Sequence, residues 1–293
     1  MPEKTNPLTP TPGSLEGVPP AAAVTPRRVG CVSYLNAAPL IVGLDAEPDT
    51  TVRVDVPSRL LDDLLAGEVD IALCPVIDYF TSPEPLTLVP AGGICCEGPT
   101  LSVRLYSKLP INEITTLHAD TDSHTSVALV QILLRELYDV APTMIEYHAR
   151  ESVAQGKIAE QPEAVLLIGD KVVTSSPLAV TYPYQLDLGE AWHLLTDLPF
   201  VFATWMTKTG TALGDLPTQL RRRLDKNLPQ VVLIAEQQAK RHGWPVELAE
   251  HYLGQVLRYR VAQRELEAIK RFGAYAYQHE LIDKPCDLRV LPL

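Results

Sequence analysis

The sequence predicts an α/β fold of two lobes with a central cleft, built on mostly parallel sheets flanked by helices. Three observations predict it. Short apolar runs alternate with helical segments between residues 28 and 73, which is typical of parallel strands joined by helices. A second unit of this kind begins near Thr115, and from Leu216 onward the leucine spacing is helical. Two crossings between two such units leave a cleft, where small ligands most often bind.

The first unit begins with a predicted strand over the apolar run Val29–Leu35. Pro39 follows and suits the first turn of a helix, where no backbone N–H is needed. Alternating residues over Thr51–Val56 predict a second strand, and the leucines of 60–65 share one helical face. Val69–Leu73 completes the unit as a third, buried strand.

Further strands and helices are expected beyond this unit. Strands over Leu86–Val89 and Thr100–Tyr106 flank a turn predicted at Gly92-Gly93. In the second unit a helix is expected from about Ser126 to Tyr138. The remaining predicted strands are Thr143–Tyr147, Ala164–Ile168 and Phe200–Met206. The chain after Leu216 is expected to be wholly helical.

These boundaries predict a discontinuous first lobe, residues 28–112 plus 207–293, and an inserted second lobe, residues 113–206. Residues 1–27 are expected to be a disordered, proline-rich extension. Met1–Pro26 holds seven prolines, a composition that cannot build a core. It also lacks the apolar stretch of a secretory signal, so we expect a cytoplasmic protein.

Composition excludes several classes of partner. Of 293 residues, 25 are Lys or Arg and 36 are Asp or Glu, and the resulting net charge of −11 repels nucleic-acid phosphates. The longest apolar runs, such as Val231–Ala235, are too short to cross a bilayer. The five cysteines form no C-x-x-C and are expected to be buried thiols in a reducing compartment. The sequence leaves monomer and homodimer both open.

The first candidate site is the strand-to-helix turn Ser33-Tyr34-Leu35-Asn36. Unpaired N–H groups and a partial positive charge at a helix start attract carboxylates. Tyr34 and Asn36 would add side-chain donors, and Asn36 an acceptor. Alternatively, Asn36 caps the helix and Ser33 bonds local backbone, which is the more common role of these residue types.

A second helix start carries Asp122-Ser123-His124-Thr125-Ser126. These short polar side chains could bind a carboxylate. Alternatively, they could simply cap the helix, although a cap needs fewer polar groups. The residue types favour neither role. If the two units face each other, this helix start lies opposite the first one. A ligand with two carboxylates would then suit the cleft.

Ser102 and Asp170 lie at the ends of predicted strands. Ser102 follows a Gly98-Pro99 turn, and its hydroxyl could orient a substrate, donate to developing charge or bond a neighbour. No G-x-S-x-G motif or local histidine marks it as a nucleophile, and the pattern alone favours the structural role. Asp170 could bind ligand at the cleft, although capping the next helix is the more usual role.

Metal and nucleotide motifs are missing from the sequence. None of the seven histidines has the spacing of H-E-x-x-H, and neither G-x-G-x-x-G nor G-x-x-x-x-G-K-[ST] occurs. We therefore predict no metal, dinucleotide or P-loop site.

Taken together and in this order, several segments resemble the chorismate dehydratase family of menaquinone biosynthesis by the futalosine route. The resemblance spans the chain from about Arg28 to the C-terminus and is specific as a set. The segments that carry it are Gly30–Asn36 with Pro39-Leu40, Gly98–Val103, Ser123–Leu129, Leu166–Asp170, Asp187–Trp192 and Thr196–Trp205.

The resemblance implies a type II periplasmic-binding-protein-like fold used as an enzyme. Such an enzyme is a carbon–oxygen lyase (hydro-lyase) that converts chorismate to 3-[(1-carboxyvinyl)oxy]benzoate and water without metal or organic cofactor. The family's functional asparagine falls on Asn36 and its functional serine on Ser102, which are the expected catalytic residues. The expected substrate-binding residues are Ser33, Tyr34, Ser123, Thr125, Ser126 and Asp170.

The expected mechanism follows from the substrate. Chorismate carries two carboxylates, which match the two helix starts. These motifs contain no evident His or Glu base, so we expect the substrate's own side-chain carboxylate, held by Ser102 and Asn36, to take the ring proton. Asn36 would also orient the departing hydroxyl.

Two other functions compete with this one. The enzyme that makes 1,4-dihydroxy-6-naphthoate in the same pathway shares the fold, but it is expected to have its own first-strand motif and a catalytic histidine. A solute-binding protein that delivers ligand to a transporter needs export or a lipid anchor, for which we find no signal. Incubation with chorismate against cyclic dehypoxanthinyl futalosine separates the two enzymes, and turnover of chorismate, rather than stable binding, excludes the solute-binding protein.

Overall fold

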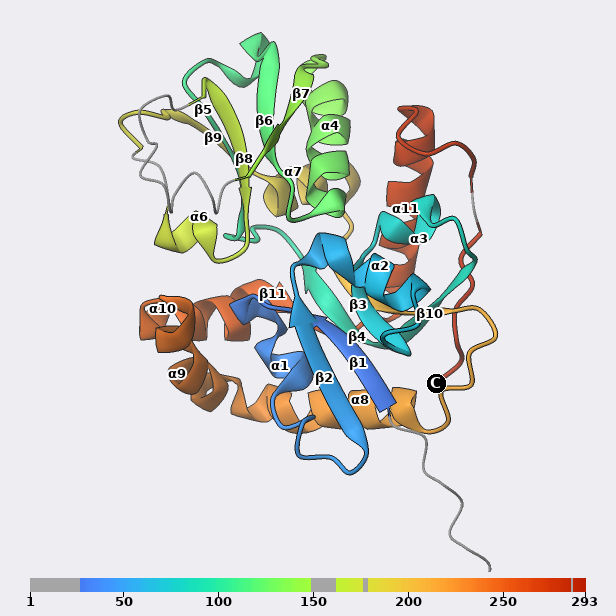
Figure 1. Cartoon of the computed structure of the whole chain (residues 1–293). Coiled ribbons are helices and arrows are strands. Elements are labelled where there is room, and N and C mark those ends of the chain that lie inside the picture. The colour runs from blue at the N-terminus through green and yellow to red at the C-terminus, as the bar shows by residue number, and fades with distance from the viewer. Residues whose placement is uncertain (1–26, 149–161, 176–178, 286) are drawn as a thin grey trace, which may run out of the picture.

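The computed structural model describes residues 27–148, 162–175, 179–285 and 287–293, which form two lobes. Each lobe is built on one β-sheet flanked by helices, and the two sheets lie one above the other in Figure 1. Residues 1–26 of the predicted extension lie outside the described residues. The first strand begins at Arg27.

The sheet of the first lobe has six strands in the order β11-β4-β10-β3-β1-β2. The strands are β1 (Arg27–Val32), β2 (Thr50–Asp55), β3 (Ile71–Pro75), β4 (Leu86–Cys96), β10 (Phe200–Lys208) and β11 (Leu257–Arg258). β1 pairs in parallel with β2 and β3, with Gly30 opposite Arg53 and Ala72. β10 runs antiparallel to β3 and β4, and β11 runs antiparallel to β4.

The sheet of the second lobe has five strands in the order β7-β6-β8-β5-β9. They are β5 (Val103–Ser107), β6 (Thr116–Asp120), β7 (Thr143–Tyr147), β8 (Ala164–Ile168) and β9 (Tyr184–Asp187). β6 pairs in parallel with β7 and β8, whereas β5 runs antiparallel to β8 and β9.

The strands change lobe earlier than the sequence predicted. β5 belongs to the second sheet although it lies within 28–112, and β10 belongs to the first sheet although most of it lies within 113–206. Both strands run antiparallel to their neighbours, so the sheets are mixed rather than mostly parallel. Hydrophobic periodicity shows that a segment is a buried strand, but it does not show in which sheet or direction the segment pairs.

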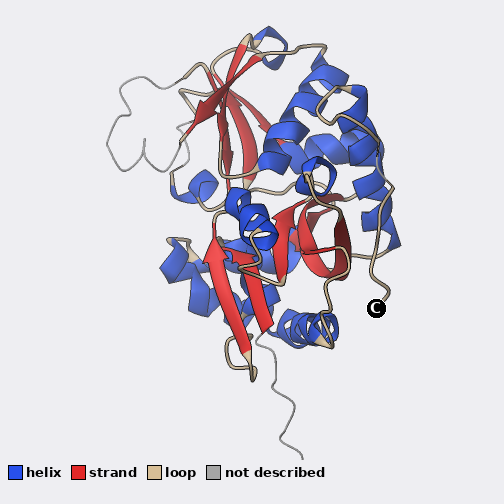
Figure 2. Ribbon diagram, turned by 45° about the vertical axis from the view of Figure 1, so that its right-hand side comes forward, coloured by secondary structure: helices blue, strands red, loops and turns tan. Residues whose placement is uncertain are grey.

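The helices lie on the outer faces of the sheets and between the lobes (Figures 1 and 2). The α-helices are α1 (Ala38–Ile41), α2 (Leu60–Leu65), α3 (Asp78–Thr81), α4 (His124–Tyr138), α6 (Lys171–Thr174), α7 (Leu188–Thr196), α8 (Leu216–Asn227), α9 (Val231–His242), α10 (Val246–His251) and α11 (Gln263–Gln278). The 3-10 turns are η1 (Leu35–Ala37), η2 (Pro57–Arg59), η3 (Ile111–Glu113) and η5 (Leu228–Gln230), and a π-helical turn, η6, covers Tyr252–Val256.

Two local predictions were wrong. Gly92 and Gly93 lie inside β4 rather than in a turn, at the irregular part of its pairing with β10. A Cβ on Gly93 would lie 2.7 Å from the carbonyl oxygen of Ala203, so glycine lets the two strands approach. The chain after Leu216 is not wholly helical either, because β11 pairs with the end of β4.

The return of the C-terminal helices to the first lobe completes the architecture. Trp205 on β10 is fully buried, as are Leu220 and Leu224 of α8, which packs against β4. Within the described residues, no helix is both long enough and apolar enough to span a membrane.

Candidate functional site

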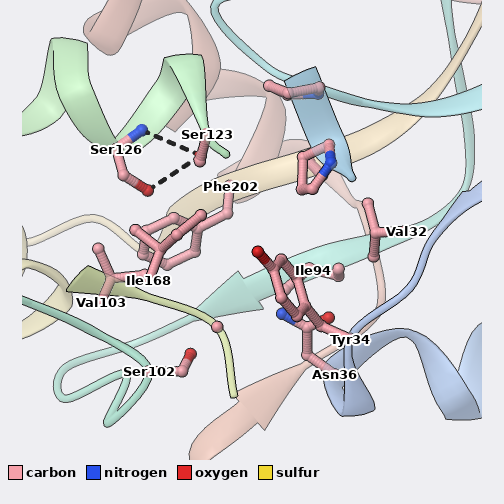
Figure 3. Close-up of a pocket in the computed structure, with 14 residues that line it drawn as sticks. Val32, Tyr34, Asn36, Ile94, Ser102, Val103, Ser123, Ser126, Ile168 and Phe202 are labelled. Atoms are coloured by element: carbon pink, nitrogen blue, oxygen red, sulfur yellow. Dashed lines mark hydrogen bonds between the residues drawn. The ribbon is translucent and has the colours of Figure 1, made fainter. Parts of the chain in front are cut away.

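A cavity lies where the two lobes meet, which is a place where small ligands often bind in two-lobed proteins. Both lobes supply its walls. Its residues are Val32, Tyr34, Asn36, Pro57, Pro75, Ile94, Ser102, Val103, Ser123, Ser126, Ile168, Gly169, Phe202 and Ala203. The wall is mainly apolar, and a few hydroxyl and amide groups point into the same space (Figure 3).

Asn36 and Ser102 reach this cavity from different parts of the chain. Asn36 lies in η1, directly after β1, and its buried Oδ1 has no hydrogen-bond partner among the described residues. Ser102 lies just before β5 and is 3% exposed. A buried acceptor without a partner is costly unless a ligand or water supplies the donor. Asn36 therefore presents an open hydrogen-bonding position to a ligand.

The carboxylate of Asp187 shapes the loop that presents Ser102. It accepts hydrogen bonds of 2.9 Å from the backbone N–H groups of Thr100 and Leu101, and it caps α7 through Gly189 and Glu190. Leu101 has a φ of 60°, an unfavourable conformation for a branched side chain, and these bonds hold it there. Asp187 thus ties the start of α7 to the loop before β5.

Gly189 allows this close approach. A Cβ at this position would lie 2.6 Å from both the Sγ of Cys96 and the carbonyl oxygen of Gly98. The segment Asp187–Trp192 contributed to the sequence resemblance, but the sequence alone did not show why it matters. Its role is to dock α7 beneath the loop that carries Ser102.

Sequence reasoning missed Tyr252, which is fully buried in the π-helical turn η6. Its hydroxyl donates a 2.6 Å hydrogen bond to the Oγ of Ser102. Burial raises the pKa of Tyr252. No motif marks this residue, because only the folding of the C-terminal helices brings it to the site.

Tyr34 joins the lobes at the cavity. Its hydroxyl donates to the carboxylate of Asp122 at 2.6 Å, and the Nζ of Lys171 lies 2.6 Å from carboxylate oxygens of both Asp122 and Asp120. Burial raises the pKa of Asp120, and Lys171 opposes that rise. Gly169 leaves room for the Tyr34 ring, since a Cβ there would lie 2.8 Å from a ring carbon.

At the second helix start, Ser123 and Ser126 line the cavity and Thr125 does not. Ser123 is the N-cap of α4 and accepts from the backbone N–H of Ser126, and the two hydroxyl oxygens are 3.1 Å apart. The hydroxyl of Thr125 instead accepts from the backbone N–H of Ile77 in the first lobe. Ser123 therefore caps α4 and also lines the cavity, so its capping role leaves the predicted carboxylate-binding role open.

Ser33 and Asp170 also lie away from the cavity wall. Ser33 lines a neighbouring hollow with Arg241 and His242. The carboxylate of Asp170 accepts bonds from the backbone N–H of Leu35 at 3.3 Å and from the indole of Trp244 at 2.8 Å. It also lies 2.8 Å from the Nδ1 of His242. Its side chain makes no capping bond to α6.

A contact between a histidine and a carboxylate also joins the two lobes. The Nδ1 of His124 lies 2.8 Å from the carboxylate of Asp78. Burial raises the pKa of Asp78, and the hydrogen bond to Asp78 raises the pKa of His124. Among the described residues, no group of three His, Cys, Asp or Glu side chains is arranged to hold a metal ion.

Comparison with known proteins places the chain in a family. Residues 27–278 match the model of a family described as menaquinone biosynthesis. A chorismate dehydratase from Thermus thermophilus is 30% identical over 263 residues, which cover 85% of this chain and 94% of the relative. The chain belongs to this menaquinone-biosynthesis family. A chorismate dehydratase from Campylobacter jejuni is 26% identical over 253 residues, covering 83% of this chain and 94% of the relative.

Solved structures confirm the predicted fold class of this family member. The alkanesulfonate-binding protein SsuA from Xanthomonas axonopodis, bound to MOPS, matches with a TM-score of 0.67 at 17% identity, covering 92% of this chain and 99% of the other. A protein from Archaeoglobus fulgidus matches with a TM-score of 0.66 at 14% identity, covering 87% and 98%. At such low identity these matches establish the two-lobed, periplasmic-binding-protein-like fold and no more.

Proposed function

We propose that this chain is a chorismate dehydratase, a hydro-lyase of menaquinone biosynthesis that converts chorismate to 3-[(1-carboxyvinyl)oxy]benzoate and water. The observation that carries the proposal is that Asn36 and Ser102 present polar groups to one buried cavity between the lobes. The two curated relatives, both chorismate dehydratases that match over nearly their whole length, support it.

In this proposal the substrate lies between the two helix starts. The hydroxyls of Ser123 and Ser126 bind the ring carboxylate, because they are the polar groups that α4 presents to the cavity. Ser102 and Asn36 bind the side-chain carboxylate and hold it over the ring. Ile94 and Phe202 supply the apolar wall against which a flat ring packs.

The reaction needs positioning more than an acid or base from the protein. The side-chain carboxylate takes the ring proton, and the electrons of that C–H bond form a ring double bond. The neighbouring C–O bond breaks, and the hydroxyl leaves with its electron pair and takes the proton from the carboxyl group as water. Near-attack geometry supplies about 7–11 kcal/mol of barrier lowering, and a donor to the developing charge adds about 3 kcal/mol.

The test is an ultraviolet assay that follows loss of the chorismate diene. We expect purified protein that has been treated with a chelator to consume chorismate and release 3-[(1-carboxyvinyl)oxy]benzoate. A parallel incubation with cyclic dehypoxanthinyl futalosine tests for the naphthoate-forming reaction. Binding of chorismate without turnover, or turnover of the futalosine derivative alone, would overturn the proposal.

We also infer a cytoplasmic location. Cys31, Cys74, Cys95 and Cys96 are buried free thiols, as expected in a reducing compartment. The fifth cysteine, Cys286, lies outside the described residues.

A further inference from the structure

We propose that Tyr252 is a positioning residue that aims the hydroxyl hydrogen of Ser102 at the substrate. This inference rests on the proposed function and assigns a role to a residue that does not line the cavity itself. It starts from one contact. The Tyr252 hydroxyl lies 2.6 Å from the Oγ of Ser102.

In the hydrogen bond between Tyr252 and Ser102, the tyrosine is the donor. The Tyr252 hydroxyl gives its hydrogen to the Oγ of Ser102 at 2.6 Å. Since a serine hydroxyl has one hydrogen, that hydrogen is then available to a group in the cavity. The tyrosine therefore sets Ser102 as a donor toward the cavity.

Tyr252 holds the hydroxyl of Ser102 in place but does not exchange protons with the substrate. Burial raises its pKa, so the phenol stays neutral and keeps its hydrogen at physiological pH. A neutral, fully buried phenol is a fixed donor. The substrate's own carboxylate then remains the proton acceptor in the reaction.

The surroundings of Tyr252 fix its ring. It stacks on Trp244 with ring centroids 4.6 Å apart and planes 19° from parallel, and the Trp244 indole donates to Asp170. The residue begins a π-helical turn, an irregularity that often occurs at functional sites because it redirects a side chain. Asp170, Trp244 and Tyr252 thus form a continuous support from the second lobe to Ser102.

The first experiment compares Tyr252→Phe with wild type in the chorismate assay. The substitution removes the hydroxyl and keeps the ring that stacks on Trp244. We expect kcat to fall by about tenfold to a hundredfold, the effect of losing one hydrogen bond next to a charged group. KM should change by less than about twofold, and the melting temperature should stay close to that of wild type.

Tyr259→Phe is the matched control. Tyr259 is a second buried tyrosine on the same C-terminal segment, and its hydroxyl has no hydrogen-bond partner among the described residues. Its loss should leave kcat unchanged. If Tyr252→Phe and Tyr259→Phe reduce kcat equally, the effect comes from repacking and the proposed role of Tyr252 is wrong.

A double-variant cycle tests whether Tyr252 acts through Ser102. In the Ser102→Ala background, Tyr252→Phe should lower the remaining kcat by less than about threefold, because the hydroxyl that it orients is gone. Independent, multiplicative losses would overturn the inference, and so would a fully active Tyr252→Phe. Failure of wild-type protein to turn over chorismate would instead refute the proposed function, so the two failures are distinguishable.

Discussion

The start of η1 and the start of α4 have similar residue types and lie on the two sides of the cavity, yet their polar groups are used differently. At α4, Ser123 caps the helix, and its hydroxyl and that of Ser126 remain on the cavity wall. At η1, the carboxylate of Asp170 already occupies the backbone N–H of Leu35. The start of α4 can still bind a ligand carboxylate, whereas the start of η1 is already bonded to the carboxylate of Asp170.

The attraction between a helix start and a carboxylate therefore has two uses in this protein. A helix start attracts a carboxylate through its unpaired N–H groups, whether that carboxylate belongs to a ligand or to the protein. At η1 the attraction joins the second lobe to the first. In the proposed reaction the first helix start acts through the Asn36 side chain, because the backbone N–H of Leu35 is already bonded to Asp170.

The largest effect is expected on kcat when Asn36 or Ser102 is replaced. Asn36→Ala and Ser102→Ala should each lower kcat by about 10²–10³-fold, as for removal of one donor to developing charge. Steady-state kinetics with chorismate would measure it. If either variant raised KM alone and kept the wild-type kcat, Asn36 and Ser102 would bind the substrate without acting in the reaction, as is expected for Ser126.

Replacing the carboxylate of Asp170 should mainly lower the stability of the fold. Asp170→Asn leaves one acceptor for donors from Leu35, Trp244 and His242, so we expect the free energy of unfolding to fall by about 1–3 kcal/mol. Denaturant unfolding would measure this change. Asp197→Asn is the control, since that side chain is 95% exposed and should change stability by less than about 0.5 kcal/mol. Equal effects of the two substitutions would contradict the role of Asp170 between the lobes.

A smaller effect is expected at the second helix start. Ser126→Ala removes a cavity hydroxyl and leaves the N-cap Ser123 in place, so KM should rise by about tenfold with little change in kcat. Isothermal titration with the reaction product would check the loss of affinity. A lower kcat at unchanged KM would show that α4 takes part in the reaction instead.

The smallest effect concerns pH and the pair His124–Asp78. Its hydrogen bond to Asp78 raises the pKa of His124 in the folded state, so the pair stabilises the fold fully below about pH 6.5. That stabilisation is lost as pH rises through the raised pKa. The His124 side chain is 49% exposed, so we expect less than about 1 kcal/mol.

Melting temperatures measured from about pH 6 to pH 9 would test this expectation. The wild type should lose slightly more stability over that range than His124→Gln, which cannot become charged. Parallel curves for the two proteins would show that the pair does not contribute.

The family, the two-lobed fold and the approximate positions of most strands could be predicted from the sequence, and the predicted bounds of Thr143–Tyr147 and Ala164–Ile168 match the structure. Apolar runs such as Val29–Val32 and Ala164–Ile168 are visible locally, because burial selects the residues themselves. The N-cap at Ser123 is equally local, since the cap and the N–H that it satisfies are three residues apart. In these cases cause and effect lie within one stretch of chain.

Only the tertiary structure decided which polar groups face the cavity. Thr125 and Asp170 have the residue types of a binding site, but their partners, Ile77 and Leu35, belong to the other lobe. Tyr252 reaches Ser102 from a segment 150 residues away. Local sequence determines what a side chain can bond. Its actual partner depends on how distant segments pack, because hydrogen bonds form between whichever groups the fold brings within about 3 Å of each other.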